Sequence, residues 1–352
     1  MAFNRREFLR ATGASIGALY AVGSVRGAAQ EQTFTLGTWG GVWEQAFKER
    51  LVPAFEDEFG VRVVFDISST TERVAKIRAS QENQQLDFAM LTPEGLITAI
   101  DAGLTEPIDT GIAGNVDDVF PNFRAPFDND GEHHGAAISW SASGLLWRRD
   151  LVPFEINEFT DLWHLMLRDK ITVQNMPTLG AATFLISAAI THGGSQENLE
   201  PGWQAMQALK PNIDSFFDLS SETINRLVQG DIWATQSIAG QALGLEDQGV
   251  AITIPREGTT YSMQGMGIPV NTKNYELANE FMNFVLRPEM QTAWAEVTQV
   301  APTTESTELP PDIQSQLVET PEVADNLIDI DFRLMSNNLN QWAERWLREI
   351  AS

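Results

Sequence analysis

The chain has 352 residues, of which 48 are acidic and 23 basic, so its formal net charge is −25, and it contains no cysteine. A surface this negative disfavours nucleic acid and anionic membranes as partners. The lack of cysteine excludes disulfides, a lipid-anchored cysteine and a thiol nucleophile or metal ligand. Lysine is scarce beside this excess of acid, which fits a host living in high salt or an ordinary acidic periplasmic protein.

The N-terminus predicts an export signal. A twin-arginine motif, Asn4 to Arg10, precedes an apolar stretch from Ala11 to Val25, and Gly27 to Ala29 supply small residues for cleavage. The apolar stretch is shorter than the ~20 residues that a membrane span needs. We therefore predict a signal peptide over residues 1–29 and a soluble periplasmic protein exported by the twin-arginine route. An ordinary cytoplasmic N-terminus is the alternative.

The first predicted strand ends in a turn that contains an aromatic ring. The strand covers Phe34 to Leu36, the turn contains Trp39, Gly40 and Gly41, and a helix begins near Glu44. The two glycines allow positive φ and a close approach of the backbone to a ligand. Trp39 follows the carboxyl end of the strand, where open α/β sheets bind ligands. A buried turn tryptophan is the alternative interpretation.

Two more strand–helix units follow. Strands are predicted over 61–65 and 86–91, each followed by a helix, and repeated strand–helix alternation predicts a parallel sheet. Ser69 and Glu72 form a capping box that begins the helix after the second strand. The same helix start offers free amides and the Thr70 hydroxyl to a polar or anionic ligand, with simple capping as the alternative.

A second α/β region is predicted after a long extended run over 136–147. Its strands are predicted over 171–174, 232–236 and 250–254, and its helices over 178–191, 202–210 and 222–229. Another extended stretch covers 263–270, and a helix follows over 276–286. At the end of the chain, Leu339, Trp342, Trp346 and Ile350 form one apolar stripe, which predicts a terminal helix that packs on the domain.

Short motifs spread over nearly the whole chain beyond the signal resemble a known family. They include Thr38 to Gly41, Ala102 to Asp109, Phe159 to Trp163, Ile254 to Gly258, Gly267 to Asn271 and Asn283 to Glu289. Their order and spacing resemble the periplasmic solute-binding proteins of ABC importers, specifically the spermidine/putrescine-binding class and its iron- and phosphonate-binding relatives.

The resemblance implies a two-lobe periplasmic binding protein fold, type II-like, in which each lobe is a mainly parallel sheet flanked by helices and crossing strands form a hinge. It implies lobe 1 over 30–139 plus about 265–302, and lobe 2 over 140–264 plus about 303–352. The implied function is capture of a small molecule between the lobes and delivery to an inner-membrane ABC permease. We expect a monomer that is no enzyme, holds no cofactor or metal, and closes on its ligand.

The resemblance also indicates the positions of the family's site residues. At several of these positions this chain has a different residue type. Trp39 matches the first aromatic residue of the polyamine site, but the paired acids of the second lobe fall near 175–180, where there is no carboxylate. The acid of the second crossing strand aligns with Gln264. An unpaired buried cation is costly, so we expect a neutral, zwitterionic or anionic ligand. The expected ligand-binding residues are Trp39, Gly40, Gly41, Thr70, Thr92, Trp140, Thr178, Gln236, Tyr261 and Gln264.

Other functions remain open at this stage. A genuine spermidine/putrescine-binding protein is the first alternative. Iron binding would need tyrosines or a histidine–carboxylate cluster, and the only adjacent histidines are His133 and His134. An exported hydrolase would need a nucleophile and base, and no G-x-S-x-G motif occurs after the signal. A binding protein of a non-ABC transporter would have the same two-lobe fold.

Overall fold

The computed structural model describes residues 32–218 and 220–352. The predicted signal peptide over 1–29 therefore lies outside the described residues. Among the residues that are described, no helix is both long enough and apolar enough to cross a membrane.

The N-terminal part of the sheet is a group of three parallel strands. The order is β2 (Arg62–Ile67), β1 (Thr33–Thr38) and β3 (Phe88–Leu91). Its helices are α1 (Val42–Ala46), which continues through a π-helical turn (Phe47–Leu51) into α2 (Val52–Phe59), then α3 (Thr70–Ala79) and α4 (Pro93–Asp101). Pro53 lies in the first turn of α2, where its missing amide hydrogen costs nothing.

Aromatic packing fixes this group. Phe34 of β1 and Phe88 of β3 lie with their ring centroids 5.2 Å and 4.9 Å from that of Phe281, and Phe55 of α2 lies 4.8 Å from it. All four rings are buried. Since large aromatic side chains contribute much of the apolar burial of a core, this cluster holds the strand ends that carry Trp39 and Thr92 in place.

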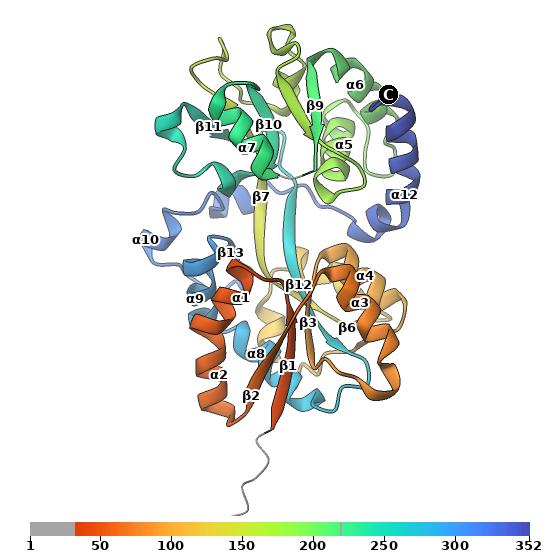
Figure 1. The fold of residues 1–352 in the computed structure, drawn as a ribbon, viewed down its shortest axis with the longest axis vertical. Coiled ribbons are helices and arrows are strands. Elements are labelled where there is room, and N and C mark those ends of the chain that lie inside the picture. The colour runs from red at the N-terminus through yellow and green to blue at the C-terminus, as the bar shows by residue number, and fades with distance from the viewer. Residues whose placement is uncertain (1–31, 219) are drawn as a thin grey trace, which may run out of the picture. The chain divides into compact units, whose positions relative to one another are not determined.

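Two long strands run between the N-terminal group and the second group of parallel strands (Figure 1). These crossing strands are β7 (Ala136–Arg148) and β12 (Tyr261–Pro269), which pair antiparallel, with Gln264 opposite Ser139. β12 also pairs with β3, and β7 with β10, so the sheet is continuous. Two short strands, β4 (Thr105–Glu106) and β13 (Ala301–Pro302), pair with β12 and β7.

The second parallel group has the order β10 (Ala234–Ile238), β8 (Ile171–Gln174) and β9 (Ile213–Phe217). β11 (Val250–Thr253) pairs antiparallel with β7. The helices of this region are α5 (Leu179–Thr191), α6 (Glu200–Leu209) and α7 (Ser220–Gln229). Nine residues of α5 are buried, which agrees with its almost continuously apolar sequence.

The C-terminal part begins with α8 (Tyr275–Val285) and α9 (Pro288–Thr298) and continues through the short helices α10 (Pro311–Gln314) and α11 (Pro321–Ala324). It ends in α12 (Phe332–Glu349), which buries Trp342 and Trp346, so the predicted terminal stripe is confirmed. A short hairpin of β5 (Asp128–Asn129) and β6 (Glu132–His133) precedes β7 in the chain.

Besides the short elements β4, β5, β6, β13, α10 and α11, two longer elements, β9 and α9, were not predicted from the sequence. β9 follows Pro211 and contains Asp214 and Ser215, so its apolar signal is short and interrupted. α9 begins at Pro288, directly after the predicted helix over 276–286. Proline ends one helix but is also favoured in the first turn of another, and here it occupies that position.

Candidate ligand-binding cleft

A cavity of about 750 Å³ lies where the N-terminal strands end. Trp39 follows β1, and the first turns of α3 and α4, which follow β2 and β3, supply most of the other groups. This is the carboxyl edge of the parallel strands, the usual binding edge of such sheets. We call it the first cavity, and its lining residues are Trp39, Ser69, Thr70, Thr71, Val74, Ala75, Arg78, Thr92, Glu94, Gly95, Thr98, Ser336, Leu339 and Asn340.

Trp39 is held at this edge by its neighbours. Gly41 has φ 69°, a left-handed value that suits glycine, and lets the chain turn directly from Trp39 into α1. The Trp39 ring lies edge-on to Trp43, with centroids 6.0 Å apart, and Trp43 stacks on Trp294. The indole is thus half-buried, with one part packed on the core and another lining the first cavity.

Arg73 of α3 lies under Trp39. Its guanidinium carbon is 5.6 Å from the Trp39 ring centroid, and the side chain is 0% exposed. The guanidinium donates to the carbonyl oxygens of Ser68 and Met90, at the ends of β2 and β3, while its Nε has no hydrogen-bond partner among the described residues. A Cβ on Gly37 would lie 2.7 Å from Arg73 Cδ, so glycine is required there.

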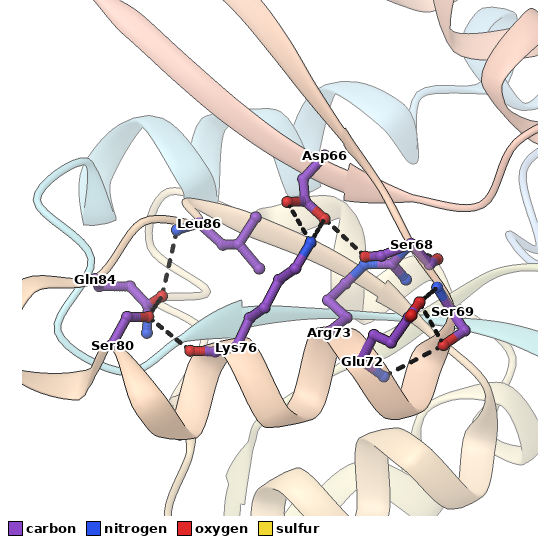
Figure 2. Close-up of polar contacts among 9 residues, drawn as sticks. All are labelled: Asp66, Ser68, Ser69, Glu72, Arg73, Lys76, Ser80, Gln84 and Leu86. Atoms are coloured by element: carbon purple, nitrogen blue, oxygen red, sulfur yellow. Dashed lines mark hydrogen bonds and ion pairs between the residues drawn. The ribbon is translucent and has the colours of Figure 1, made fainter.

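The charge of Arg73 is only partly offset. Burial lowers the pKa of its guanidinium to about 10, and the nearby Asp66 and Glu72 act in the opposite direction. Figure 2 shows that Asp66 accepts hydrogen bonds from Lys76 and Ser68, while Glu72 closes the capping box with Ser69. The predicted capping box is therefore confirmed. A cation behind the indole makes the first cavity less favourable for a ligand with several positive charges.

Thr70, Thr92 and Glu94 form the polar side of the first cavity. The Thr70 hydroxyl oxygen accepts a hydrogen bond from the Thr92 amide at 3.3 Å, and Thr92 occupies the N-cap position of α4 without a side-chain capping bond. The Glu94 Oε2 atom is buried without a hydrogen-bond partner among the described residues. Burial raises the pKa of the Glu94 carboxyl, although its own amide and Thr92 oppose that effect. In the part of the chain that the structure describes, Glu94 is the only carboxyl group that lines this cavity.

A second cavity, of about 190 Å³, lies at the corresponding edge of the other parallel group. Gln174 is the last residue of β8, Gln236 lies near the end of β10, and the first turn of α5 closes the cavity. The described residues that line it are Ser143, Gln174, Leu179, Gly180, Thr183, Gln236, Ser237, Ile238, Tyr261 and Ser262. No charged residue is among them. Gln236 is 9% exposed, and its Oε1 and the Ser262 hydroxyl have no hydrogen-bond partner among the described residues.

The crossing strands present different residues on their two faces. Side chains alternate along a strand, so Ser143 on β7 and Ser262 on β12 share the face that borders the second cavity, which we call the inner face. Gln264 lies on the same face, where its Oε1 accepts a hydrogen bond from Ser139 at 2.7 Å. Trp140 lies on the opposite, outer face and donates to the Pro302 carbonyl oxygen at 3.0 Å.

The ten predicted residues therefore separate into groups. Trp39, Thr70 and Thr92 line the first cavity, whereas Gln236 and Tyr261 line the second. The Tyr261 ring points away from the cleft, between Phe123 and Phe332. Thr178 caps α5 beside the second cavity, Gly40 and Gly41 shape the turn at Trp39, and Gln264 and Trp140 lie on the two faces described above.

The adjacent histidines His133 and His134 each contact a different side chain. His133 Nδ1 lies 2.5 Å from Asp128 Oδ1, and His134 Nδ1 lies 3.1 Å from the Thr105 hydroxyl. In the part of the chain that the structure describes, no three histidine, aspartate or glutamate side chains gather as a metal site would require.

Comparison with known proteins agrees with this geometry. The model of the bacterial extracellular solute-binding protein family matches residues 50–320. The chain belongs to this family. A crystal structure of an ABC transporter protein from Clostridium perfringens superposes with a TM-score of 0.82 at 27% identity, covering 90% of this chain and 99% of that one. The fold of this solute-binding protein is therefore that of the periplasmic binding proteins, as predicted.

Two curated relatives of this solute-binding protein differ in the ligand that their names give. The putrescine-binding periplasmic protein of Escherichia coli is 25% identical over 303 residues, covering 79% of this chain and 80% of the relative. The gamma-aminobutyric acid-binding protein of Pseudomonas aeruginosa is 22% identical over 338 residues, covering 90% of this chain and 92% of the relative. Family membership alone thus leaves the charge of the ligand undecided.

The sequence did not suggest Glu94, Gln174, Ser143 or Ser262 as cleft residues. Glu94 occupies the first turn of a helix, where an acid is expected for the helix dipole alone. Ser143 and Ser262 are small residues within long extended runs, and only the pairing of β7 with β12 puts them beside Gln236.

Proposed function

We propose that this chain is the periplasmic substrate-binding protein of an ABC importer, and that its ligand lies between the first and second cavities. Both cavities lie at carboxyl ends of parallel strands, and the crossing strands connect the two groups. The lobes would be the two parallel groups with their helices, at the boundaries expected from the sequence. Closure of the lobes around the ligand would give the form that an inner-membrane permease recognises.

We further assign the ligand as a small organic molecule with no more than one ammonium group. The observation that carries this assignment is the charge of the cavity walls. Among the described residues, Glu94 is the single carboxyl group lining either cavity, and no charged group lines the second. A diamine would leave one ammonium without an anionic partner, which costs several kcal/mol in a desolvated site. Arg73 behind Trp39 adds to that cost.

Export by the twin-arginine route, a monomeric state and the absence of enzymatic activity complete the proposal. The name of the Escherichia coli relative supports the periplasmic location. The description of the Clostridium perfringens structure as an ABC transporter supports the transport role. A true putrescine-binding protein is the second candidate, favoured by the 25% identity with the Escherichia coli protein over most of its length.

A matched series of four-carbon ligands tests the assignment. Putrescine, gamma-aminobutyric acid, succinate and 1,4-butanediol have the same chain length but differ in charge. A ligand that binds the folded state raises the melting temperature, so we expect putrescine to give a smaller shift than one of the other three. The site control is Trp39→Ala, which should abolish that shift while leaving the melting temperature without ligand close to the original. The largest shift with putrescine would refute the assignment.

A further inference from the structure

The outer face of β7 borders a third cavity, of about 480 Å³, that the proposed ligand cleft does not use. Its aromatic wall consists of Trp140, Phe123 and Phe120. The Trp140 and Phe123 rings stack with centroids 5.3 Å apart, and Phe120 lies edge-on to Phe123 at 6.3 Å. Phe120 is 39% exposed, so part of its ring is open to solvent at this cavity.

Four carboxyl groups belong to the polar lining, beside neutral side chains such as Asn122, Thr304 and Gln314. We call this third cavity the outer cavity. Its lining includes Glu305, Glu308, Glu319 and Asp325, and among the described residues no lysine, arginine or histidine lines it. Within residues 32–218 and 220–352, none of the four takes part in an ion pair. Unpaired acids are common in so acidic a chain. These carboxylates indicate a binding site only because they line a cavity with aromatic walls.

Glu319 distinguishes this cavity from an acidic surface. The side chain is 5% exposed, and its Oε1 accepts a hydrogen bond from the amide of Ala142 in β7 at 2.8 Å. Burial raises the pKa of the Glu319 carboxyl, since the charged form loses its hydration. In its charged form, a buried carboxyl group that lines a cavity with aromatic walls costs free energy unless hydrogen bonds or a cation offset the charge.

We propose that the outer cavity is a second binding site, for a small organic cation with an apolar body. Aromatic faces and carboxylates both attract an ammonium group, and the volume lies in the range of small-molecule sites. The alkyl part of such a cation would contact Leu309 and Leu327. Trp140 and Ser143 point to opposite faces of β7, so this site is separate from the cleft.

Choline and its neutral isostere 3,3-dimethyl-1-butanol test the proposal by calorimetric titration of the full chain. They have the same shape, so the difference in affinity isolates the positive charge. We expect one choline bound per chain, with the neutral alcohol at least about tenfold weaker. Equal affinities, or no binding of choline, would overturn the proposal without affecting the cleft assignment.

Two variants locate the site. Phe120→Ala removes an exposed wall residue, and Glu308→Gln combined with Asp325→Asn removes two wall charges; each should weaken choline binding about fivefold or more. The matched control combines Glu322→Gln with Asp312→Asn, two exposed acids nearby that do not line the cavity, and should leave the affinity unchanged. If Trp39→Ala abolishes choline binding instead, choline occupies the cleft and the outer site is refuted. Melting curves check that each variant is folded.

Discussion

The two faces of the crossing strands offer opposite chemistry. The inner face carries Ser143, Ser262 and Gln264, which are neutral hydrogen-bonding groups, while the outer face carries Trp140 beside the buried carboxyl of Glu319. Residues that alternate along one strand therefore contribute to two cavities of different character. The aromatic rings and acids expected of a polyamine site are found together on the outer face, whereas the inner face lacks the acids.

The largest expected effect is a difference in stability between two tryptophan variants, one at the outer cavity (Trp140) and one at the cleft (Trp39). Trp140 is 3% exposed, stacked on Phe123 and hydrogen-bonded to Pro302. Trp140→Ala should lower the free energy of unfolding by about 3–5 kcal/mol, because it leaves a large cavity in a packed wall. Trp39 is half-buried, so Trp39→Ala should cost clearly less stability and act on ligand binding instead. Urea denaturation measures both variants; equal losses would contradict the contrast.

A smaller effect on stability is expected at Gln236. Its Oε1 is buried without a partner among the described residues, and its Nε2 makes only a long 3.4 Å hydrogen bond to Thr260. Replacing an unsatisfied buried polar group by an apolar one of similar size is close to neutral for folding. Gln236→Leu should therefore change stability by less than about 1 kcal/mol while weakening the cleft ligand roughly tenfold.

The natural control for that variant is Gln264→Leu. Gln264 lies on the same face, but its Oε1 is already occupied by Ser139. Losing this bond leaves a serine hydroxyl unpaired, so Gln264→Leu should be the more destabilising of the two. A reversed order in thermal denaturation would show that Gln236 is structural and would remove it from the proposed site.

The smallest expected effect is a pH dependence at Glu94. Because burial raises the pKa of this carboxyl in the folded state, its stabilising contribution is present below the unfolded value of 4.5 and is lost as the pH rises through the folded value. Glu94→Gln removes that dependence. The variant should therefore gain stability relative to the original protein as the pH rises above 4.5, the unfolded value. Parallel denaturation curves across this range check the sign, and a relative loss would contradict it.

Much of the fold was predictable because its elements have strong local signals. β1, β8, α5 and α12 were expected from apolar runs or stripes, and α3 from its capping box. β9 and α9 were not, because a short mixed strand has little pattern and Pro288 suits both an end and a beginning. The candidate site was partly predictable: Trp39, Thr70 and Thr92 follow strands directly, so the carboxyl-edge rule applies to them.

The sequence alone determined the α/β class, the turn that carries Trp39 and the lack of acids where the polyamine class has them, since each depends on residues close together in the chain. The tertiary structure decided which side chains share a cavity. Glu94 lies in the same cavity as Trp39 because β3 pairs with β1. Trp140 lies outside the cleft because its side chain is on the outer face of β7. Strand pairing brings residues together that local sequence patterns cannot relate, because the pairing partners are far apart in the chain.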